Sequence, residues 1–451
     1  MAIKHRYAIM LLLGALSIVL AAIHSPGQMS VDSGMALYEG ATGQAVGWGP
    51  TFFASIIAWL GGGSIGAALF VALNSAATYG VFAKLIAGYD GTERRAPLRL
   101  YAAALIALNP VFMFYVGILW KDVMLATLAM VASMSILDAA NRRDPPRISA
   151  AWIPVLCLSA IPLLRQQGVL IAFPLTISLA WVYARARTRT VSRIGVMAGF
   201  LSMTLAGTFA FDALSKSTIA PLPASPLSVG FNTVRSYDVV GMVAFAEKND
   251  DSKWTGADGE TIQRIRALYS AERIDTLWHD DKVRGYFNAM PPERLSAVWL
   301  GGIKHDPVAY LSHRAAALRY LFGMDSMKGC VSAYWGVAAP SEYLARVGLR
   351  EEMDPRDRLI GRWAESSRET IFFRHWLYAV MLALSIVAVY RRRRSPDAIA
   401  LWSIAAAAVL YAGSYLPTTI ACDFRYLYSM MALASFLSAY LLLNPRKTTQ
   451  P

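Results

Sequence analysis

The sequence predicts an all-α protein that crosses a membrane many times. Of its 451 residues, 56% are hydrophobic, and the mean hydropathy is +0.40. The apolar residues form runs of about 18 to 22, and a helix of that length spans the roughly 30 Å hydrocarbon core of a bilayer. A water-soluble protein of this length would instead alternate core and surface positions. The lipid bilayer is therefore the predicted environment.

We place about ten transmembrane helices along the chain. They cover residues 7–23, 65–87, 98–116, 121–139, 150–165, 168–184, 194–213, 373–390, 397–416 and 424–443. The first run is too long for the core of a typical signal peptide, so we expect it to remain as a span.

Basic residues support this number of spans. With ten spans, every basic cluster lies on the same side of the membrane, which is the positive-inside pattern. The clusters are Lys4/Arg6, Arg94/Arg95/Arg99, Arg142/Arg143/Arg147, Arg185/Arg187/Arg189/Arg193, Arg391 to Arg394 and Arg446/Lys447. The predicted location is the plasma (inner) membrane, with both termini cytoplasmic.

Three parts follow from this topology. Residues 1–213 form an N-terminal membrane bundle, 214–372 a mostly helical outer loop domain, and 373–451 the C-terminal membrane helices. The outer loop domain carries about 20 basic and about 20 acidic groups, so the net charge of +13 comes from the cytoplasmic clusters. A nucleic-acid partner is therefore not expected.

The first outer loop, residues 24–64, is expected to hold two short helices. Residues 33–42 read as a helix after an Asp cap, and the apolar stretch 50–60 is too short to cross a bilayer. We expect the second helix to lie in the membrane interface, with Trp48 and Trp59 at headgroup level.

Cationic side chains at the outer ends of spans are unusual, because insertion disfavours them there. Lys121, Arg165 and Arg425 stand at three such ends, and each has an acidic or amide neighbour. The neighbours are Asp122, Gln166 and Asp423. If the three cations converge, they make a pocket suited to a phosphate group. The alternative is that each side chain reaches separately to the lipid headgroups.

Asp32 lies in the first outer loop, which contains no Lys or Arg. A carboxylate beside an outward-facing cleft can take a proton from a substrate hydroxyl. Glu39 follows seven residues later, two helical turns on, so both carboxylates would face the same way. A purely structural role for Asp32, as the cap of the following helix, also stays open.

Metal and cysteine chemistry give weaker signals. Asp122 and Asp423 begin spans, where an acid also suits the helix dipole, and either could help to hold a divalent cation, Mg or Mn, against a phosphate. The chain has no ligand spacing typical of a metal site, so no cofactor is predicted with certainty.

Cys157 lies inside a span, whereas Cys330 and Cys422 could pair outside the membrane.

Four segments together resemble the motifs of bacterial membrane glycosyltransferases of the GT-C type, which include proteins similar to dolichyl-phosphate-mannose mannosyltransferases. The segments are SPGQMSVDSGMALYEGATGQAVGWGP, NPVFMFYVGILWKDV, LLRQQG and PTTIACDFRYLYSM. The resemblance covers the membrane bundle, roughly two-thirds of the chain, and its weight comes from the order and shared sidedness of the motifs.

The resemblance implies inverting transfer of one sugar from a polyprenyl-phosphate carrier to an extracytoplasmic glycan, lipid or protein. Asp32 would be the catalytic base, with Glu39 in reserve, and Lys121, Arg165 and Arg425 would neutralise the donor phosphate. Many relatives have two adjacent acids where this chain has Asp32 followed by Ser33. The departure leaves both the base and the role of a metal open.

Two other functions stay open from the sequence. A polysaccharide polymerase or ligase would also combine many spans with a large outer loop, and its critical arginines and histidine would lie in that loop. A transporter of lipid-linked glycans would carry its charges at mid-span, with broken helices at membrane depth.

Overall fold

A computed structural model of the chain describes residues 2–47, 49–89, 96–142, 144, 146–185, 190–222, 226–246 and 251–444. Within these ranges every regular element is a helix, and the β-type pairings are isolated bridges. Six helical stretches are long and apolar enough to cross a membrane. The protein is an all-α membrane protein, as the sequence predicts.

The six stretches contain α1 (Ala2–His24), α4 (Gly63–Ala87), α7 (Lys121–Asn141), η2 and α9 (Gln166–Gly168 and Val169–Ala184), α10 (Thr190–Thr218), and η4 and α22 (Phe424–Leu427 and Tyr428–Leu443). The other four predicted spans fall on shorter apolar helices. These are α5 (Ala96–Ala107), η1 and α8 (Ile148–Ala151 and Trp152–Leu164), α20 (His375–Arg391) and α21 (Ala398–Ser414). The number of ten spans stays a prediction.

The expected continuous helix at 98–116 is wrong. After α5 the chain breaks and restarts as α6 (Pro110–Tyr115). Proline disfavours helical backbone in the residue before it and suits the first position of a new helix. The Asn109 side chain caps α6 by accepting a hydrogen bond from the Val111 N–H at 2.9 Å.

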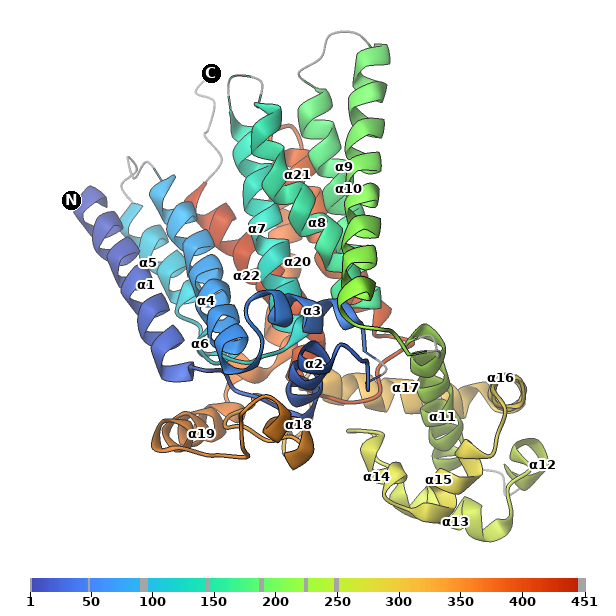
Figure 1. Ribbon diagram of the computed structural model, residues 1–451. Helices are drawn as coiled ribbons and strands as arrows, with labels where there is room; N and C mark the ends of the chain where they lie inside the picture. Colours follow the sequence, from blue (N-terminus) through green and yellow to red (C-terminus); the bar gives the residue numbers. More distant parts are fainter. Residues whose placement is uncertain are drawn as a thin grey trace.

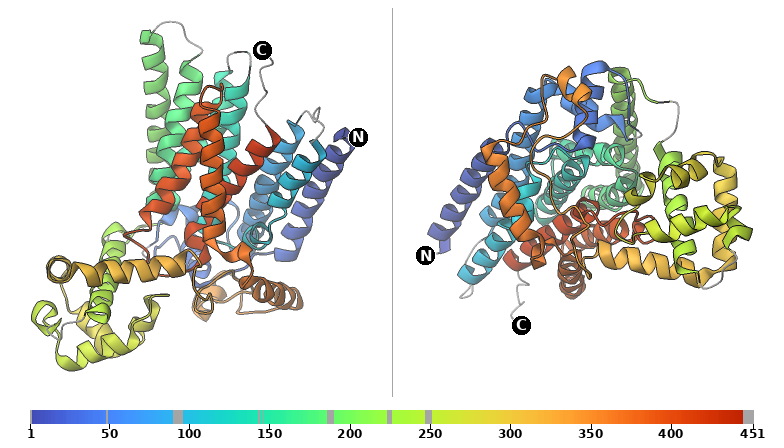
Figure 2. Two further views of the ribbon diagram at one scale, coloured as in Figure 1. Left: turned by 180° about the vertical axis from the view of Figure 1, so that it is seen from behind. Right: turned by 90° about the horizontal axis from the view of Figure 1, so that it is seen from below.

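The helices pack side by side, and the described residues of 25–62 and 219–374 cover one end of the bundle (Figures 1 and 2). We call this the capped end. Lys4, Arg6 and Arg391 lie at the opposite end, where α1 starts and α20 finishes. Several residues named above lie outside the described ranges: Trp48, Arg94, Arg95, Arg143, Arg187, Arg189, Arg446 and Lys447.

Short backbone bridges join distant segments at the capped end. Residues of the first loop pair with the turn before α7 and with the segment that returns toward α20. The segment after α10 also pairs with the first loop, and the turn before η4 pairs with residue 273. The pairs are Gln28–Ile118, Met29–Val337, Gln44–Ala220 and Arg273–Ala421. These bridges satisfy backbone groups that would otherwise be buried without partners.

The first loop forms the two expected helices. In α2 (Val31–Thr42) the N-cap is Ser30, whose N–H donates to the Ser33 hydroxyl at 3.1 Å. The predicted Asp cap is therefore wrong, because Asp32 lies inside the first turn with its side chain free to face a neighbour. Gly43 ends the helix with φ 70°, a left-handed conformation that favours glycine.

The second helix of the loop, α3 (Thr51–Trp59), packs against the protein, and its expected place in the membrane interface stays a prediction. It buries most of its apolar residues, including Phe52, Phe53 and Ile57, against the protein. Trp59 keeps 41% exposure and donates from its indole N–H to the Thr218 hydroxyl at 3.0 Å. The helix is thus one wall of the capped end.

The described residues of 219–374, which we call the loop segment, contain nine α-helices. They are α11 (Pro226–Phe245), α12 (Asp251–Thr255), α13 (Gly259–Leu268), α14 (Asp275–Trp278), α15 (Asp281–Asn288), α16 (Pro292–His305), α17 (Pro307–Leu321), α18 (Ser341–Arg346) and α19 (Pro355–Arg368), followed by η3 (Ile371–Phe373). Buried residues between Tyr237 and Ala317 form a separate apolar core. A disulfide joins Cys330 to Cys422, and Cys157 is a buried free thiol.

Candidate functional site

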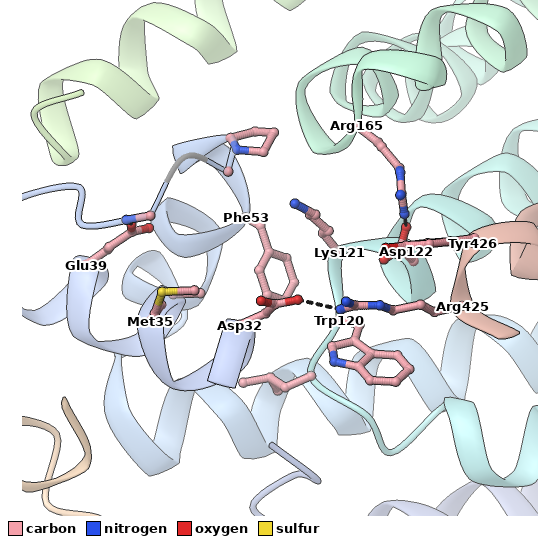
Figure 3. A pocket seen from close by; sticks show the side chains of 15 residues that line it. Asp32, Met35, Glu39, Phe53, Trp120, Lys121, Asp122, Arg165, Arg425 and Tyr426 are labelled. Atoms are coloured by element: carbon pink, nitrogen blue, oxygen red, sulfur yellow. Dashed lines mark hydrogen bonds and ion pairs between the residues drawn. The ribbon is translucent and has the colours of Figure 1, made fainter. Parts of the chain in front are cut away.

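A cavity of about 130 Å³ lies at the capped end, between the first loop, the start of α7, the turn before η2, and η4 (Figure 3). We call it the charged pocket. Its charged lining residues are Asp32, Glu39, Lys121, Asp122, Arg165 and Arg425. The structure thus brings together all five residues for which the sequence suggested a direct catalytic or phosphate-binding role, together with Asp122. If all six groups are ionised, their formal charges cancel.

Asp32 and Arg425 form an ion pair at the rim of this pocket. The Asp32 side chain is 49% exposed, whereas that of Arg425 is 19% exposed and lies over the Trp120 ring, 5.0 Å from its centroid. Burial opposes ionisation of Asp32, but the charges of Arg425, Lys121 and Arg165 outweigh it and lower its pKa below the ordinary value. The surrounding cations therefore favour the ionised form of Asp32, and about half of its side chain is open to solvent.

Arg165 and Asp122 form a second ion pair, deeper in the pocket. The side chains are 16% and 2% exposed, so the pair is held away from solvent. The rings of Tyr415 and Tyr426 lie 5.6 Å and 5.0 Å from the Arg165 guanidinium carbon, and such contacts favour the cation. The charge of Asp122 also acts on the neighbouring Lys121.

Lys121 begins α7 and points into the pocket between Phe53 and Arg165 (Figure 3). A Cβ atom at Gly49 would lie 3.3 Å from its Nζ atom, so a side chain at that position would crowd the ammonium group. The position of Lys121 adds a point charge near the carboxylate of Asp32.

Glu39 also lines the pocket, but its carboxylate has a structural task. One oxygen accepts hydrogen bonds from the Val46 and Gly47 N–H groups at 2.9 and 2.8 Å, which ties α2 to the chain that follows it. Burial raises the pKa of Glu39, while these two bonds and the charge of Lys121 partly oppose the rise.

The predicted supporting residues Asp423 and Gln166 lie next to the charged pocket. Asp423 is buried and pairs with Arg273 at 3.0 Å and with Arg425 at 3.6 Å. Burial raises the pKa of Asp423, against the opposing charges of these two arginines. Gln166 lines a second cavity instead.

The second cavity, of about 370 Å³, adjoins the first and is largely apolar. We call it the apolar groove. It shares Pro50, Lys121, Arg165 and Tyr426 with the charged pocket. Its further apolar walls include Val169, Leu170, Phe231, Val234 and Ile420. The two cavities together offer a charged end and an apolar end to one ligand.

A divalent cation does not fit the arrangement of these carboxylates. Among the described residues, no three His, Cys, Asp or Glu side chains gather as metal ligands would. The carboxylates of Asp32 and Asp122 each face an arginine, and Asp423 faces two. The neighbouring arginines therefore already compensate their negative charge.

Sequence reasoning missed three residues at this site. Trp120 and Tyr426 hold the Arg425 guanidinium between them, and both stand next in sequence to predicted cations, which was the available signal. Arg273 of the loop segment has no such signal, because its partner Asp423 is 150 residues away.

Comparison with protein-family models, curated proteins and solved structures finds no match for this chain. No matched protein therefore assigns a role to any residue of the site.

The Arg165–Asp122 pair leads to a stability prediction. Arg165→Ala leaves a buried, unpaired carboxylate, which costs about 3–5 kcal/mol, so we expect much less folded protein in detergent. The double variant Arg165→Gln/Asp122→Asn removes both charges and should restore most of the yield. Monodispersity and thermal aggregation of the purified variants measure this. Equal stability of the Ala variant and the original protein would contradict the pairing.

Proposed function

We propose that the protein is a membrane glycosyltransferase that moves a single sugar from a polyprenyl-phosphate carrier to an extracytoplasmic glycan, lipid or protein acceptor. One observation carries the proposal: three cations and an exposed carboxylate face one small cavity, and an apolar groove opens beside it. A lipid phosphate that carries a sugar has an apolar chain, an anionic group and a polar group, in the order that matches the groove and the charged pocket.

The proposal includes a finer topology. Ten spans, with the four shorter apolar helices among them, leave both termini in the cytoplasm of the plasma (inner) membrane and the capped end outside. The outer domain is then 214–372, between membrane parts 1–213 and 373–451. The basic residues Lys4, Arg6 and Arg391 at the opposite end support this orientation through the positive-inside tendency.

The donor phosphate would lie where the two cavities meet, since both are lined by Lys121 and Arg165. Arg425 would approach from the charged pocket. Guanidinium groups bind phosphate oxygens with two parallel hydrogen bonds, and an ammonium adds a compact charge. The polyprenyl chain would leave along the apolar groove past Val169 and Phe231, which are 51% and 47% exposed.

The reaction is a single displacement at the anomeric carbon. Asp32 takes the proton from the acceptor hydroxyl, whose oxygen forms the new bond to that carbon. The bond from the carbon to the phosphate oxygen breaks, and its electron pair leaves with the carrier phosphate. Lys121, Arg165 and Arg425 stabilise that departing charge, and preorganised stabilisation of this kind is often the largest catalytic contribution.

Charge balance in the pocket favours this step. As the leaving phosphate gains one negative charge, Asp32 loses one by accepting the proton, so the total charge within the cavity does not change. The phosphate also competes with Asp32 for Arg425. When Arg425 turns to the phosphate, the carboxylate loses its ion pair and becomes a stronger base.

The alternatives fit the site less well. A polymerase or ligase is expected to use arginines and a histidine of the large loop, but no residue of the loop segment lines the charged pocket. The loop segment gives the apolar groove uncharged residues only, among them Phe231 and Val234. A transporter is expected to carry its charges at mid-span, whereas Lys121, Arg165 and Arg425 stand at helix ends.

The two candidate bases can be separated by amide substitutions. We expect Asp32→Asn to lower sugar transfer by about 10²- to 10⁴-fold, because the base is lost. Glu39→Gln should keep most activity, since an amide oxygen can still accept the Val46 and Gly47 N–H groups. Transfer is measured as the change of carrier-linked sugar in membranes that contain equal amounts of each variant.

Asp212→Asn serves as the matched control, since Asp212 pairs with Lys216 on α10 and lines neither cavity. Full activity of Asp32→Asn would remove Asp32 as the base. Loss of activity in Glu39→Gln alone would transfer that role to Glu39.

Arg425→Ala should weaken binding of a polyprenyl phosphate. A hydrogen bond to a charged group contributes about 1.5–3 kcal/mol, so we expect an affinity about 10- to 100-fold lower. Binding of farnesyl phosphate to the purified protein measures the effect. Arg264→Ala, which alters an exposed ion pair of the loop segment, is the control and should bind as the original protein does. Equal affinities of the original protein, Arg425→Ala and Arg264→Ala for farnesyl phosphate would argue against a phosphate site.

The pH dependence of transfer tests the competition for Arg425. In the free protein the pKa of Asp32 is lowered by Arg425, Lys121 and Arg165 against the effect of burial. Activity requires the ionised form, so kcat/KM should fall only when the pH drops through that low pKa. In the donor complex Arg425 faces the phosphate, the pKa rises, and kcat should fall at a higher pH. If kcat and kcat/KM fell at the same pH on the acid side, the competition for Arg425 would be contradicted.

A further inference from the structure

Five charged residues of alternating sign form a continuous row from the loop segment to the charged pocket. Arg273 contacts Asp275 through Nε at 3.0 Å and Asp423 through Nη2 at 3.0 Å. Asp423 in turn lies 3.6 Å from Arg425, whose guanidinium pairs with Asp32. The loop segment therefore contacts the pocket electrostatically, although it gives the pocket no lining residue.

Backbone contacts hold Arg273 against this row. Residues on either side of it pair with the turn before η4: the Cys422 N–H donates to the Glu272 carbonyl at 2.8 Å, and the Ile274 N–H donates to the Ile420 carbonyl at 2.9 Å. The disulfide between Cys330 and Cys422 joins the same turn to a second part of the loop segment. The position of Arg273 is thus set by the fold and not by a flexible surface contact.

Asp423 requires the positive charge of Arg273 beside it. Its side chain is 7% exposed, and a buried carboxylate without compensating charge is costly. Two arginines compete to supply the charge. Arg273 holds Asp423 with the closer contact, which leaves Arg425 farther from Asp423 and directed toward Asp32. The Trp120 and Tyr426 rings support Arg425 in that direction, at 5.0 and 5.7 Å.

We propose that Arg273 is a positioning residue: by neutralising Asp423, it keeps Arg425 directed at Asp32 and at the ligand of the charged pocket. Through Arg273, the loop segment thereby determines whether Arg425 is directed at the charged pocket or drawn toward Asp423. Only the identity of that ligand, a carrier phosphate, rests on the proposed function. The arrangement of Arg273, Asp423, Arg425 and Asp32 does not.

The test measures the protonation of Asp32 without any donor or acceptor. Dicyclohexylcarbodiimide reacts with protonated carboxyl groups, so at pH 6 its rate of attachment to Asp32, followed by mass spectrometry, is proportional to the protonated fraction. Each unit of rise in the pKa increases the rate about tenfold. The charged groups that share the pocket with Asp32 are Arg425, Lys121, Arg165, Asp122 and Glu39, of which Glu39 lies on the same helix.

We expect Arg273→Gln to speed the labelling of Asp32 several-fold, because Arg425 turns toward the uncompensated Asp423. Arg273→Lys keeps the charge and should label at the original rate. The decisive comparison is in the Arg425→Ala background, where Arg273→Gln should have no further effect. An equal acceleration in both backgrounds would mean that Arg273 acts on Asp32 through space, and no acceleration in the original background would mean that it does not act at all. Either result overturns the proposal.

A further variant covers the case in which Arg273→Gln does not fold. Arg273→Gln/Asp423→Asn removes both charges and leaves no unpaired buried carboxylate, so Asp32 should label no faster than in the original protein. Faster labelling would overturn the proposal. Binding of farnesyl phosphate is measured in parallel, and we expect it to weaken in Arg273→Gln but not in Arg273→Lys. If the original protein does not bind farnesyl phosphate while the labelling results hold, the proposed function fails and the positioning role stands.

Discussion

Cations buried at the end of an apolar bundle need opposite charges, and this requirement organises the capped end. Arg165 takes its partner Asp122 from α7, and Arg425 takes Asp32 from the first loop. Each partner comes from a different part of the chain. Since an unpaired buried charge costs several kcal/mol, the segments that carry the charges must meet. Backbone bridges between the same segments, such as Gln28 with Ile118, reinforce the arrangement.

The two ion pairs differ in a way that matters for chemistry. Asp122 is almost fully buried, and Arg165 is held between this carboxylate and two tyrosine rings, which suits a fixed charge. Asp32 is half-exposed, and Arg425 is shared with a second carboxylate, which suits a charge that can be redirected. A ligand that brings its own negative charge can exchange with Asp32 at modest cost. In the proposed reaction, the exchange at the second pair would bind the anion and release the base in the same event.

The helices themselves were largely predictable. Apolar runs mark the long helices, and α2 and α3 follow the short patterns of the first loop. The errors were local in origin: Pro110 broke a predicted span, and Ser30 replaced Asp32 as a cap. The interfacial position expected for α3 stays a prediction, because its own residues do not fix it. An apolar helix of nine residues buries itself equally well in lipid or in protein, and only the neighbouring helices decide between them.

The sequence by itself determined the bilayer environment, the helical class and the enrichment of basic residues at one set of helix ends. These properties depend on hydropathy and charge that can be read along the chain. The tertiary structure alone decided that Arg425 meets Asp32 across 393 residues, that Glu39 is tied to the backbone beside it, and that Arg273 reaches Asp423. Local patterns mark a charge as unusual, but its partner depends on how distant segments pack.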